Sequence, residues 1–172
     1  MEGDSLAVGT RPFIVRELSD WRITHSVKIG RHTAEGIAAL REEAASLPDV
    51  IHVSLGTNDD PRHVSAFRDS IRDVMDLSGP DRCVVWANIV RPRLRGTSYA
   101  GYNRALAAES APRENLRVVN WARLVRENPR WLSGDGVHAT VEGYAGRARV
   151  VARSVQRCQL SDGSAGIVAS SR

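Results

Sequence analysis

The sequence has few of the features that mark a membrane, repeat or exported protein. No apolar run is long enough to span a bilayer. The start, Met1-Glu2-Gly3, shows no basic and apolar leader, and no internal repeat is evident. As the chain is written we expect it to be cytoplasmic, or extracytoplasmic if an upstream leader or membrane domain has been lost.

Lysine is almost missing. Lys28 is the only lysine among the 24 basic residues, and all the others are arginines. These arginines are spread along the chain, with no basic run and no interleaving with aromatic residues of the kind that RNA and single-strand binders use. The net charge of +4 therefore does not predict a nucleic-acid partner.

Cysteine is scarce, with Cys83 and Cys158 the only two residues of this type. Their separation does not match a metal-binding motif, and we expect neither a metal nor an organic cofactor. Cys83 opens an apolar run, which predicts a small buried side chain. The sequence leaves a Cys83–Cys158 disulfide open, but in a cytosolic chain free thiols are the favoured expectation.

The residues that are present describe one globular domain. The 172 residues are 42% hydrophobic and 26% charged, which suffices for a real core. We assign residues 1–158 to this domain. The Gly/Ser-rich remainder, residues 159–172, has the composition of a disordered tail.

Strand and helix patterns alternate along the chain. Short β-branched or apolar runs predict strands, and apolar residues three or four apart predict helices. The predicted strands are residues 21–27, 50–55, 83–89 and 116–121, and the predicted helices are residues 5–20, 34–46 (capped by Thr33), 64–77, 99–109 and 141–155. This order predicts an α/β domain with a parallel sheet and right-handed crossovers.

Every candidate for chemistry follows a strand or a strand-like stretch. These residues are Ser5, Gly30, Asn58, Asp135 and His138. Because ligands bind at the carboxyl ends of the strands in such sheets, we expect the five residues to meet at one edge. A carboxylate three residues before an imidazole suggests an orienter and a base, and Ser5 is the best candidate for the nucleophile.

The first strand is the feature that fits least well. Only two residues precede Gly3, although a nucleophile loop in this architecture should follow a strand. The first strand is therefore expected to be truncated. We predict that the natural coding sequence continues upstream with a short strand rich in Val, Leu and Ile.

Four sequence blocks together resemble those of the SGNH (GDSL) hydrolase family. They are Gly3-Asp4-Ser5-Leu6-Ala7-Val8-Gly9, Gly30, Gly56-Thr57-Asn58-Asp59 and Asp135-Gly136-Val137-His138. The resemblance implies a three-layer α/β/α flavodoxin-like fold and acyl transfer from esters to water or to another alcohol. It implies Ser5 as the nucleophile, His138 as the base and Asp135 as the residue that orients the imidazole.

The resemblance also implies an oxyanion hole. Its donors would be the backbone N–H groups of Ser5 and Gly30 and the side-chain amide of Asn58. Gly36 is the rival for the glycine position, and Gly30 is favoured because it lies at the strand-to-helix turn. Asp59 and Asp60 are expected to be turn and cap residues.

The remaining polar residues are expected to have structural roles. His25, His32, His52 and His63 have no carboxylate or nucleophile at motif spacing, although His32 could line the pocket near Gly30. The Arg91-Pro92-Arg93-Leu94-Arg95 loop could contact an anionic substrate, but a solvated loop is the favoured interpretation.

A finer resemblance is to the SGNH domains of bacterial membrane acyltransferases that O-acetylate peptidoglycan and other surface glycans. It runs through residues 30–33, 53–58, 120–121 and 131–138. The sequence therefore predicts a serine esterase for small-molecule or glycan esters with a short acyl group. An O-acyltransferase is the alternative, and a non-catalytic binding module on the same fold is the second alternative.

Overall fold

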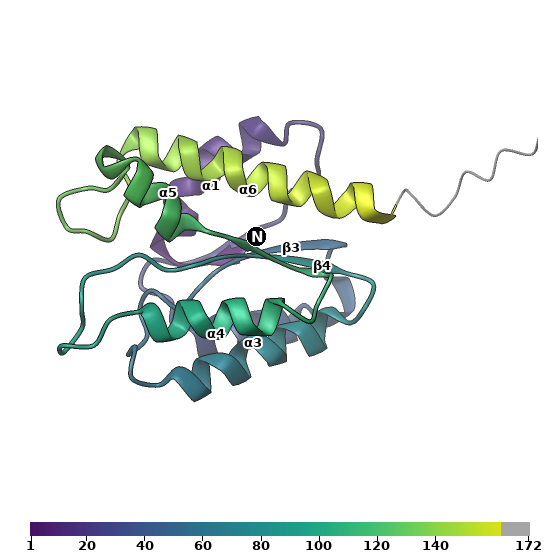
Figure 1. Ribbon diagram of the computed structural model, residues 1–172. Coiled ribbons are helices and arrows are strands. Elements are labelled where there is room, and N and C mark those ends of the chain that lie inside the picture. Colours follow the sequence, from purple (N-terminus) through teal and green to yellow (C-terminus); the bar gives the residue numbers. More distant parts are fainter. Residues whose placement is uncertain (163–172) are drawn as a thin grey trace, which may run out of the picture.

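A computed structural model of the chain describes residues 1–162 (Figure 1). Strands and helices alternate from end to end. The strands are β1 (Glu2–Gly3), β2 (Ser26–Val27), β3 (Val50–Ser54), β4 (Cys83–Ala87) and β5 (Leu116–Val119). The α-helices are α1 (Ser5–Glu17), α2 (Thr33–Glu42), α3 (Val64–Ser78), α4 (Ala100–Ser110), α5 (Trp121–Glu127) and α6 (Val141–Asp162), with short 3₁₀ turns at Ala44–Ser46 and Pro129–Trp131.

The strands form one parallel sheet in the order β2-β1-β3-β4-β5. Both neighbours of β1 follow it later in the chain, so the strand order reverses at β1. An open parallel sheet binds its ligands at such a switch point. Asp4, the N-cap residue of α1, directly follows β1, and Ser5 comes next.

Helices cover both faces of the sheet, as Figure 1 shows with α1 and α6 above and α3 and α4 below. On one face, α2, α3 and α4 pack their apolar side chains, among them Ile37, Phe67 and Leu106, over β3 and β4. On the other face, Ile14 of α1 and Val151 of α6 pack against the opposite side of β4 and β5. The expected three-layer α/β/α architecture is therefore confirmed.

The strand predicted at residues 21–27 is much shorter than the sequence pattern indicates. Residues 21–27 alternate as a strand would, but only Ser26–Val27 pair. Their partners are Glu2 and Gly3, the whole of β1. Because β1 has only two residues, residues 21–25 have no strand beside them in the described chain.

The start of α2 is also capped differently from the prediction. The N-cap residue is His32, and Thr33 is the first helical residue. The Asp59 carboxylate, from the loop after β3, accepts hydrogen bonds from the backbone N–H and the hydroxyl of Thr33. A carboxylate from a distant loop thus caps the helix, which no local pattern could reveal.

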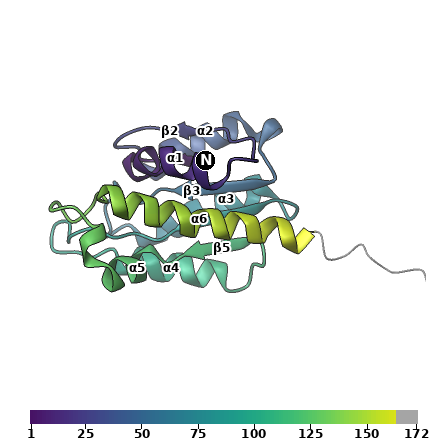
Figure 2. The ribbon, with the colours of Figure 1, turned by 90° about the horizontal axis from the view of Figure 1, so that it is seen from above.

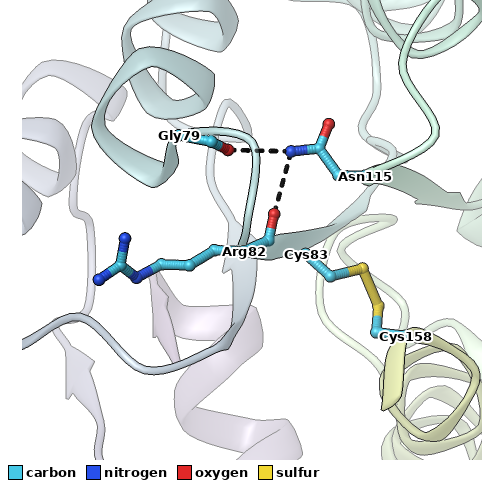
Figure 3. Close-up of a disulfide and its surroundings, with 5 residues drawn as sticks. All are labelled: Gly79, Arg82, Cys83, Asn115 and Cys158. Carbon is cyan, nitrogen blue, oxygen red and sulfur yellow. Dashed lines mark hydrogen bonds between the residues drawn. A yellow bond between two sulfur atoms is a disulfide. The ribbon is translucent and has the colours of Figure 1, made fainter. Parts of the chain in front are cut away.

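The expectation of free thiols is wrong, because Cys83 and Cys158 form a disulfide. Cys83 begins β4 and Cys158 lies on α6, and their Cα atoms are 5.9 Å apart (Figure 3). Beside the disulfide, Asn115 donates hydrogen bonds to the carbonyl oxygens of Gly79 and Arg82. The amino end of β4 is therefore tied to α6 by the disulfide, and the segment ahead of it is tied to the start of β5 through Asn115. The pairing could not be predicted from the sequence, because Cys158 comes 75 residues after Cys83 and approaches it only when α6 packs across the sheet.

The disulfide is expected to stabilise the fold by about 2–4 kcal/mol, since it closes a long loop in the unfolded chain. Guanidinium unfolding of the Cys83→Ala/Cys158→Ala variant should show this loss. Dithiothreitol should lower the parent protein's stability to that of the variant and leave the variant unchanged. Two titratable thiols per chain in the purified, air-oxidised protein would contradict the pairing.

Helix α6 continues to Asp162, beyond the predicted helix end at residue 155 and the predicted domain boundary at residue 158. The rest of the predicted tail, residues 163–172, lies outside the described residues. Within residues 1–162, none of the helices combines the length and apolarity that a membrane crossing requires.

Candidate active site

Ser5 begins α1, directly after the turn that leads from β1. Asp4 is the N-cap residue, and its carboxylate accepts from the backbone N–H of Leu6 at 2.9 Å. Ser5 is therefore the first helical residue, at the carboxyl edge of the sheet. A Cβ on Gly3 would lie 2.5 Å from the Ala7 Cβ, so only glycine lets the strand turn this closely into the helix.

A tight loop between Ser133 and His138 presents the carboxylate and the imidazole. The backbone N–H of Ser133 donates to the carbonyl of His138 at 2.8 Å, which closes the loop. Gly136 has a φ of +70°, a conformation that favours glycine. The loop folds around Asp135, whose Oδ1 accepts from the backbone N–H groups of Val137 and His138, each at 2.9 Å.

Ser5, His138 and Asp135 form one hydrogen-bonded line, which we refer to as the candidate triad. His138 Nε2 lies 3.0 Å from Ser5 Oγ, and His138 Nδ1 lies 2.6 Å from Asp135 Oδ2. The hydrogen bond from His138, helped by the two backbone N–H groups, holds the pKa of Asp135 well below its usual range. The carboxylate is thus ionised at neutral pH and faces the imidazole.

The candidate triad is open to solvent. The side chains of His138 and Asp135 are 45% and 50% exposed. Ser133, which the sequence analysis did not single out, places its hydroxyl 2.9 Å from Asp135 Oδ1 and 2.7 Å from the His138 carbonyl. Its place inside the WLSGDGVH stretch was the available signal.

The two other candidate donors, Gly30 and Asn58, lie on adjoining loops. Gly30, with a φ of +74°, belongs to the turn between β2 and α2. Asn58 follows β3, and its Nδ2 donates to the carbonyl of Arg31 at 3.1 Å. The amide nitrogen of Asn58 has a second hydrogen, which this hydrogen bond does not use and which can be donated to another acceptor.

Gly36, the rival to Gly30, has a packing role. It is buried inside α2, where a Cβ would lie 2.5 Å from Leu55 and 2.9 Å from the Glu2 carboxylate. Its lack of a side chain therefore allows α2 to approach the sheet.

Arg91 was expected in a solvated loop, but it is half-buried and supports the Asn58 loop. Its guanidinium donates to the carbonyl of Thr57 and lies 3.5 Å from Asn58 Oδ1. The available signal was its place just after β4, at the edge where the strands end.

A buried ion pair between Arg31 and Glu2 fixes the Gly30 loop to the sheet. The Arg31 guanidinium pairs with the Glu2 carboxylate and donates to the carbonyl and hydroxyl oxygens of Ser26 at 2.9 Å. Burial raises the pKa of Glu2, and the Arg31 hydrogen bond opposes that shift. The turn carrying Gly30 is thereby fixed to β1 and β2.

Asp59, Asp60 and His32 lie near the Gly30 loop. Asp59 caps α2 and lies 3.0 Å from His32 Nδ1, and Asp60 accepts from the backbone and guanidinium of Arg62. A cavity of about 340 Å³ is lined by His32, Asp59, Asp60, His63 and Tyr102, among others. His32 therefore lines a hollow, but the lining includes neither Gly30 nor the candidate triad.

Residue Asp4 also belongs to a fully buried polar group beneath Ser5. Ser54 Oγ lies 3.5 Å from Asp4 Oδ1 and accepts from Arg147 Nη2 at 2.9 Å. The Arg147 guanidinium lies over the Trp121 ring, 5.2 Å from its centroid. Burial raises the pKa of Asp4, and the charge of Arg147 opposes the rise.

The described residues contain no group of three or more His, Cys, Asp or Glu side chains that could hold a metal ion. At this edge the structure brings together a serine, an imidazole and a carboxylate, with an amide donor on a neighbouring loop.

Comparison with known proteins gives structural matches only. A scan of protein-family models finds no match, and neither does a search of curated proteins. Among solved structures, the chain is similar to the C-terminal catalytic domain of peptidoglycan O-acetyltransferase A from Streptococcus pneumoniae, with a TM-score of 0.72 and 16% identity over 94% of this chain and 91% of that one.

Two further structures match over a similar extent. A carbohydrate esterase of family 3 from Talaromyces cellulolyticus gives a TM-score of 0.69 and 16% identity over 95% of this chain and 97% of that one. A GDSL-like lipase from Bacteroides thetaiotaomicron gives a TM-score of 0.71 and 16% identity over 90% of this chain and 85% of that one. The chain has the fold of GDSL-type ester hydrolases, as its sequence blocks predict.

Proposed function

We propose that this protein is a serine esterase that cleaves carboxylic esters through an acyl-Ser5 intermediate. The observation that carries the proposal is the hydrogen-bonded line from Ser5 Oγ through His138 to Asp135. A serine hydroxyl is a poor nucleophile until a base removes its proton. His138 Nε2 is within hydrogen-bonding distance of that proton, which is what general-base catalysis requires.

The reaction follows from this geometry. His138 Nε2 takes the Ser5 proton while Ser5 Oγ attacks the ester carbonyl carbon, and the imidazolium then protonates the departing alcohol oxygen. In the second half, water gives a proton to His138 as it attacks the acyl carbon, and the imidazolium returns that proton to Ser5 Oγ as the bond between Ser5 Oγ and the acyl carbon breaks and the acid leaves. Asp135 keeps the Nδ1 proton on the side away from Ser5 and stabilises the imidazolium.

The oxyanion of each tetrahedral intermediate is assigned to three donors. They are the backbone N–H groups of Ser5 and Gly30 and the side-chain amide of Asn58. The two loops that carry Gly30 and Asn58 are joined through the bond from Asn58 to the Arg31 carbonyl. Arg91, at the Thr57 carbonyl and near Asn58 Oδ1, helps to aim the amide nitrogen of Asn58.

Asn58→Ala is expected to lower kcat about a hundredfold, because one donor to the oxyanion is lost. KM should change little, since the oxyanion exists only after attack. Steady-state kinetics on p-nitrophenyl acetate measures both constants. Asn58→Asp should be no better than alanine, because a carboxylate cannot donate. A loss of less than about threefold in Asn58→Ala would remove Asn58 from the oxyanion hole.

The substrate that fits best is a short acyl ester, such as an O-acetyl group, on a small molecule or glycan. Two structural matches are a carbohydrate esterase and a peptidoglycan O-acetyltransferase domain. The half-exposed His138 and Asp135 side chains are accessible to an ester carried on a bulky alcohol. Nucleophile, base and orienter are all present and hydrogen-bonded, which favours an enzyme over a binding module.

Transfer to a glycan hydroxyl is the second candidate function, and the O-acetyltransferase match favours it. Both reactions share the acyl-enzyme, and they differ in whether water or an acceptor hydroxyl attacks it. The disulfide supports work in an oxidising compartment outside the cytoplasm, where such bonds persist.

The direct test compares turnover of p-nitrophenyl acetate and p-nitrophenyl octanoate. Faster turnover of the acetate supports a short-acyl esterase, and a preference for the octanoate would contradict the short-acyl assignment. Adding a chitooligosaccharide acceptor separates the two reactions. Acetylated sugar detected by mass spectrometry indicates transfer, and release of acetate alone indicates hydrolysis. Absence of turnover with both esters would count against the esterase.

A further inference from the structure

Helix α6 begins three residues after His138 and lies over the sheet beside both segments that supply the candidate triad. Figure 2 shows α6 with α1 on one side of its first half and α5 on the other. Arg147, in this half of the helix, is only 1% exposed. Arginine is rarely buried to this extent, so the contacts that Arg147 makes on its two sides indicate what it does.

On one side, the guanidinium is linked to the start of α1, where Ser5 lies. Arg147 Nη2 donates to Ser54 Oγ at 2.9 Å, and Ser54 Oγ lies 3.5 Å from Asp4 Oδ1. The same carboxylate oxygen accepts from the backbone N–H of Leu6 at 2.9 Å. The backbone N–H of Asp4 also donates to the Ser54 carbonyl at 3.0 Å. Ser54 therefore contacts the residue that caps α1 through both its backbone and its hydroxyl.

On the other side, the guanidinium is linked to the base of the loop that carries His138. Arg147 lies over the Trp121 ring, 5.2 Å from its centroid, and Trp121 stacks on Trp131 with the ring centroids 6.2 Å apart. The carbonyl of Trp131 accepts from the backbone N–H of Thr140 at 2.9 Å, a bond that closes the base of the loop. The aromatic pair therefore connects Arg147 to the residue from which this loop begins.

We call these five side chains the buried bridge; they are Asp4, Ser54, Arg147, Trp121 and Trp131. The first four are at most 2% exposed. Arg147 Nε and Nη1 have no hydrogen-bond partner among the described residues. The hydrogen bond to Ser54 is therefore the polar contact that fixes the guanidinium over Trp121.

We propose that Ser54 and Arg147 are positioning residues, which hold Ser5 Oγ at the distance from His138 Nε2 that proton transfer requires. This inference rests on the proposed function, in which that transfer begins the reaction. The two atoms belong to residues 133 positions apart in the chain, and the buried bridge joins the segments that carry them. A displacement of about 1 Å in such an alignment costs on the order of a hundredfold in rate. Because Ser54 and Arg147 are buried, they do not touch a bound ester.

The test replaces Ser54 with alanine and measures steady-state kinetics on p-nitrophenyl acetate. Ser54→Ala keeps the charges of Asp4 and Arg147 and removes the hydroxyl between them. We expect kcat to fall at least about tenfold while KM stays within about twofold, since the alignment is needed for the chemical step and not for binding. A fall of less than about threefold in kcat would overturn the proposal.

Ser78→Ala is the matched control. Ser78 is equally buried, and its hydroxyl donates to the carbonyl of Val74 at the end of α3 that leads into the amino end of β4. The control thus loses one buried hydrogen bond without touching the buried bridge, and its kcat and KM should stay within about twofold of the parent's. An equal fall of kcat in Ser54→Ala and Ser78→Ala would contradict positioning, because it would reflect lost stability alone.

A structural readout separates this proposal from the proposed function. Hydrogen exchange at the Leu6 amide, followed by NMR, should be at least about tenfold faster in Ser54→Ala, because the Asp4 carboxylate that accepts from it is held less firmly. Ser78→Ala should leave it unchanged. A parent protein that turns over no ester would refute the proposed function. Unchanged exchange at Leu6 in Ser54→Ala would refute the positioning role, whether or not the parent is active.

A double-mutant cycle tests whether the buried bridge acts as one unit. Trp131→Leu removes the aromatic stack at the His138 end and should also lower kcat at least about tenfold. If both ends act through Arg147, Ser54→Ala/Trp131→Leu should lose no more than about threefold beyond the larger single loss. Losses that multiply, or a Trp131→Leu variant with the kcat of the parent, would overturn the link between Arg147 and the His138 loop.

Discussion

Replacing Ser5 with alanine is expected to lower kcat for p-nitrophenyl acetate by at least about ten-thousandfold. The substitution removes the oxygen that lies 3.0 Å from His138 Nε2. The oxyanion donors would remain, so a small residual rate above the uncatalysed reaction should persist. His138→Ala should lose a similar factor, because the two residues act as one unit.

The fold should survive this change. Alanine is a good first residue of a helix, and the Asp4 cap on the Leu6 N–H is unaffected. The Tm should therefore stay within about 2 °C of the parent. Ser19→Ala, at an exposed position after α1, is the matched control and should keep full activity.

Covalent labelling provides a second readout. A fluorophosphonate probe should add one adduct to the parent and to Ser19→Ala, and none to Ser5→Ala. Peptide mapping should place the adduct on Ser5. Retention of more than about a tenth of the parent's activity in purified Ser5→Ala would refute Ser5 as the nucleophile.

The candidate triad was predictable because each of the two motifs that supply it is short and continuous in the sequence. The Asp135–His138 spacing lies within one loop, and Gly3-Asp4-Ser5-Leu6 is a compact motif. The parallel sheet then brings both to one edge, because the carboxyl ends of its strands meet there. Spacing and topology thus predicted that Ser5 and His138 would lie at one edge, and the structure places Ser5 Oγ 3.0 Å from His138 Nε2.

Features that depend on distant packing were not predictable in the same way. The cap on α2 comes from Asp59, 26 residues after Thr33, and the disulfide partner of Cys83 is on the last helix. Residues 21–27 have a strand pattern, yet only the part beside β1 pairs. The sequence pattern shows that a segment can form a strand, whereas its pairing depends on whether another strand lies beside it.

The buried arginine beneath Ser5 gives the second large effect. Arg147→Met is expected to lower the free energy of unfolding by about 3–5 kcal/mol, because the buried Asp4 carboxylate loses the nearby positive charge, to which it is linked through the Ser54 hydroxyl. Burial lowers the pKa of Arg147 to about 10, so the guanidinium is still charged at neutral pH. Urea unfolding at pH 7 measures the loss. Arg149→Met, at an exposed position on the same helix, should change stability by less than about 0.5 kcal/mol.

The pH dependence separates this charge effect from lost packing. Burial raises the pKa of Asp4 while Arg147 opposes the rise, so removal of Arg147 should raise that pKa further. A group with a raised pKa in the folded state binds more protons when folded, and its unfavourable effect grows as pH rises. The deficit of Arg147→Met relative to the parent should therefore be larger at pH 8 than at pH 5. In an Asp4→Asn background, Arg147→Met should show a deficit relative to Asp4→Asn that does not change between the two pH values. A pH-independent deficit in Arg147→Met itself would mean that Arg147 stabilises the protein through its contacts with Trp121 and Ser54 and not through Asp4.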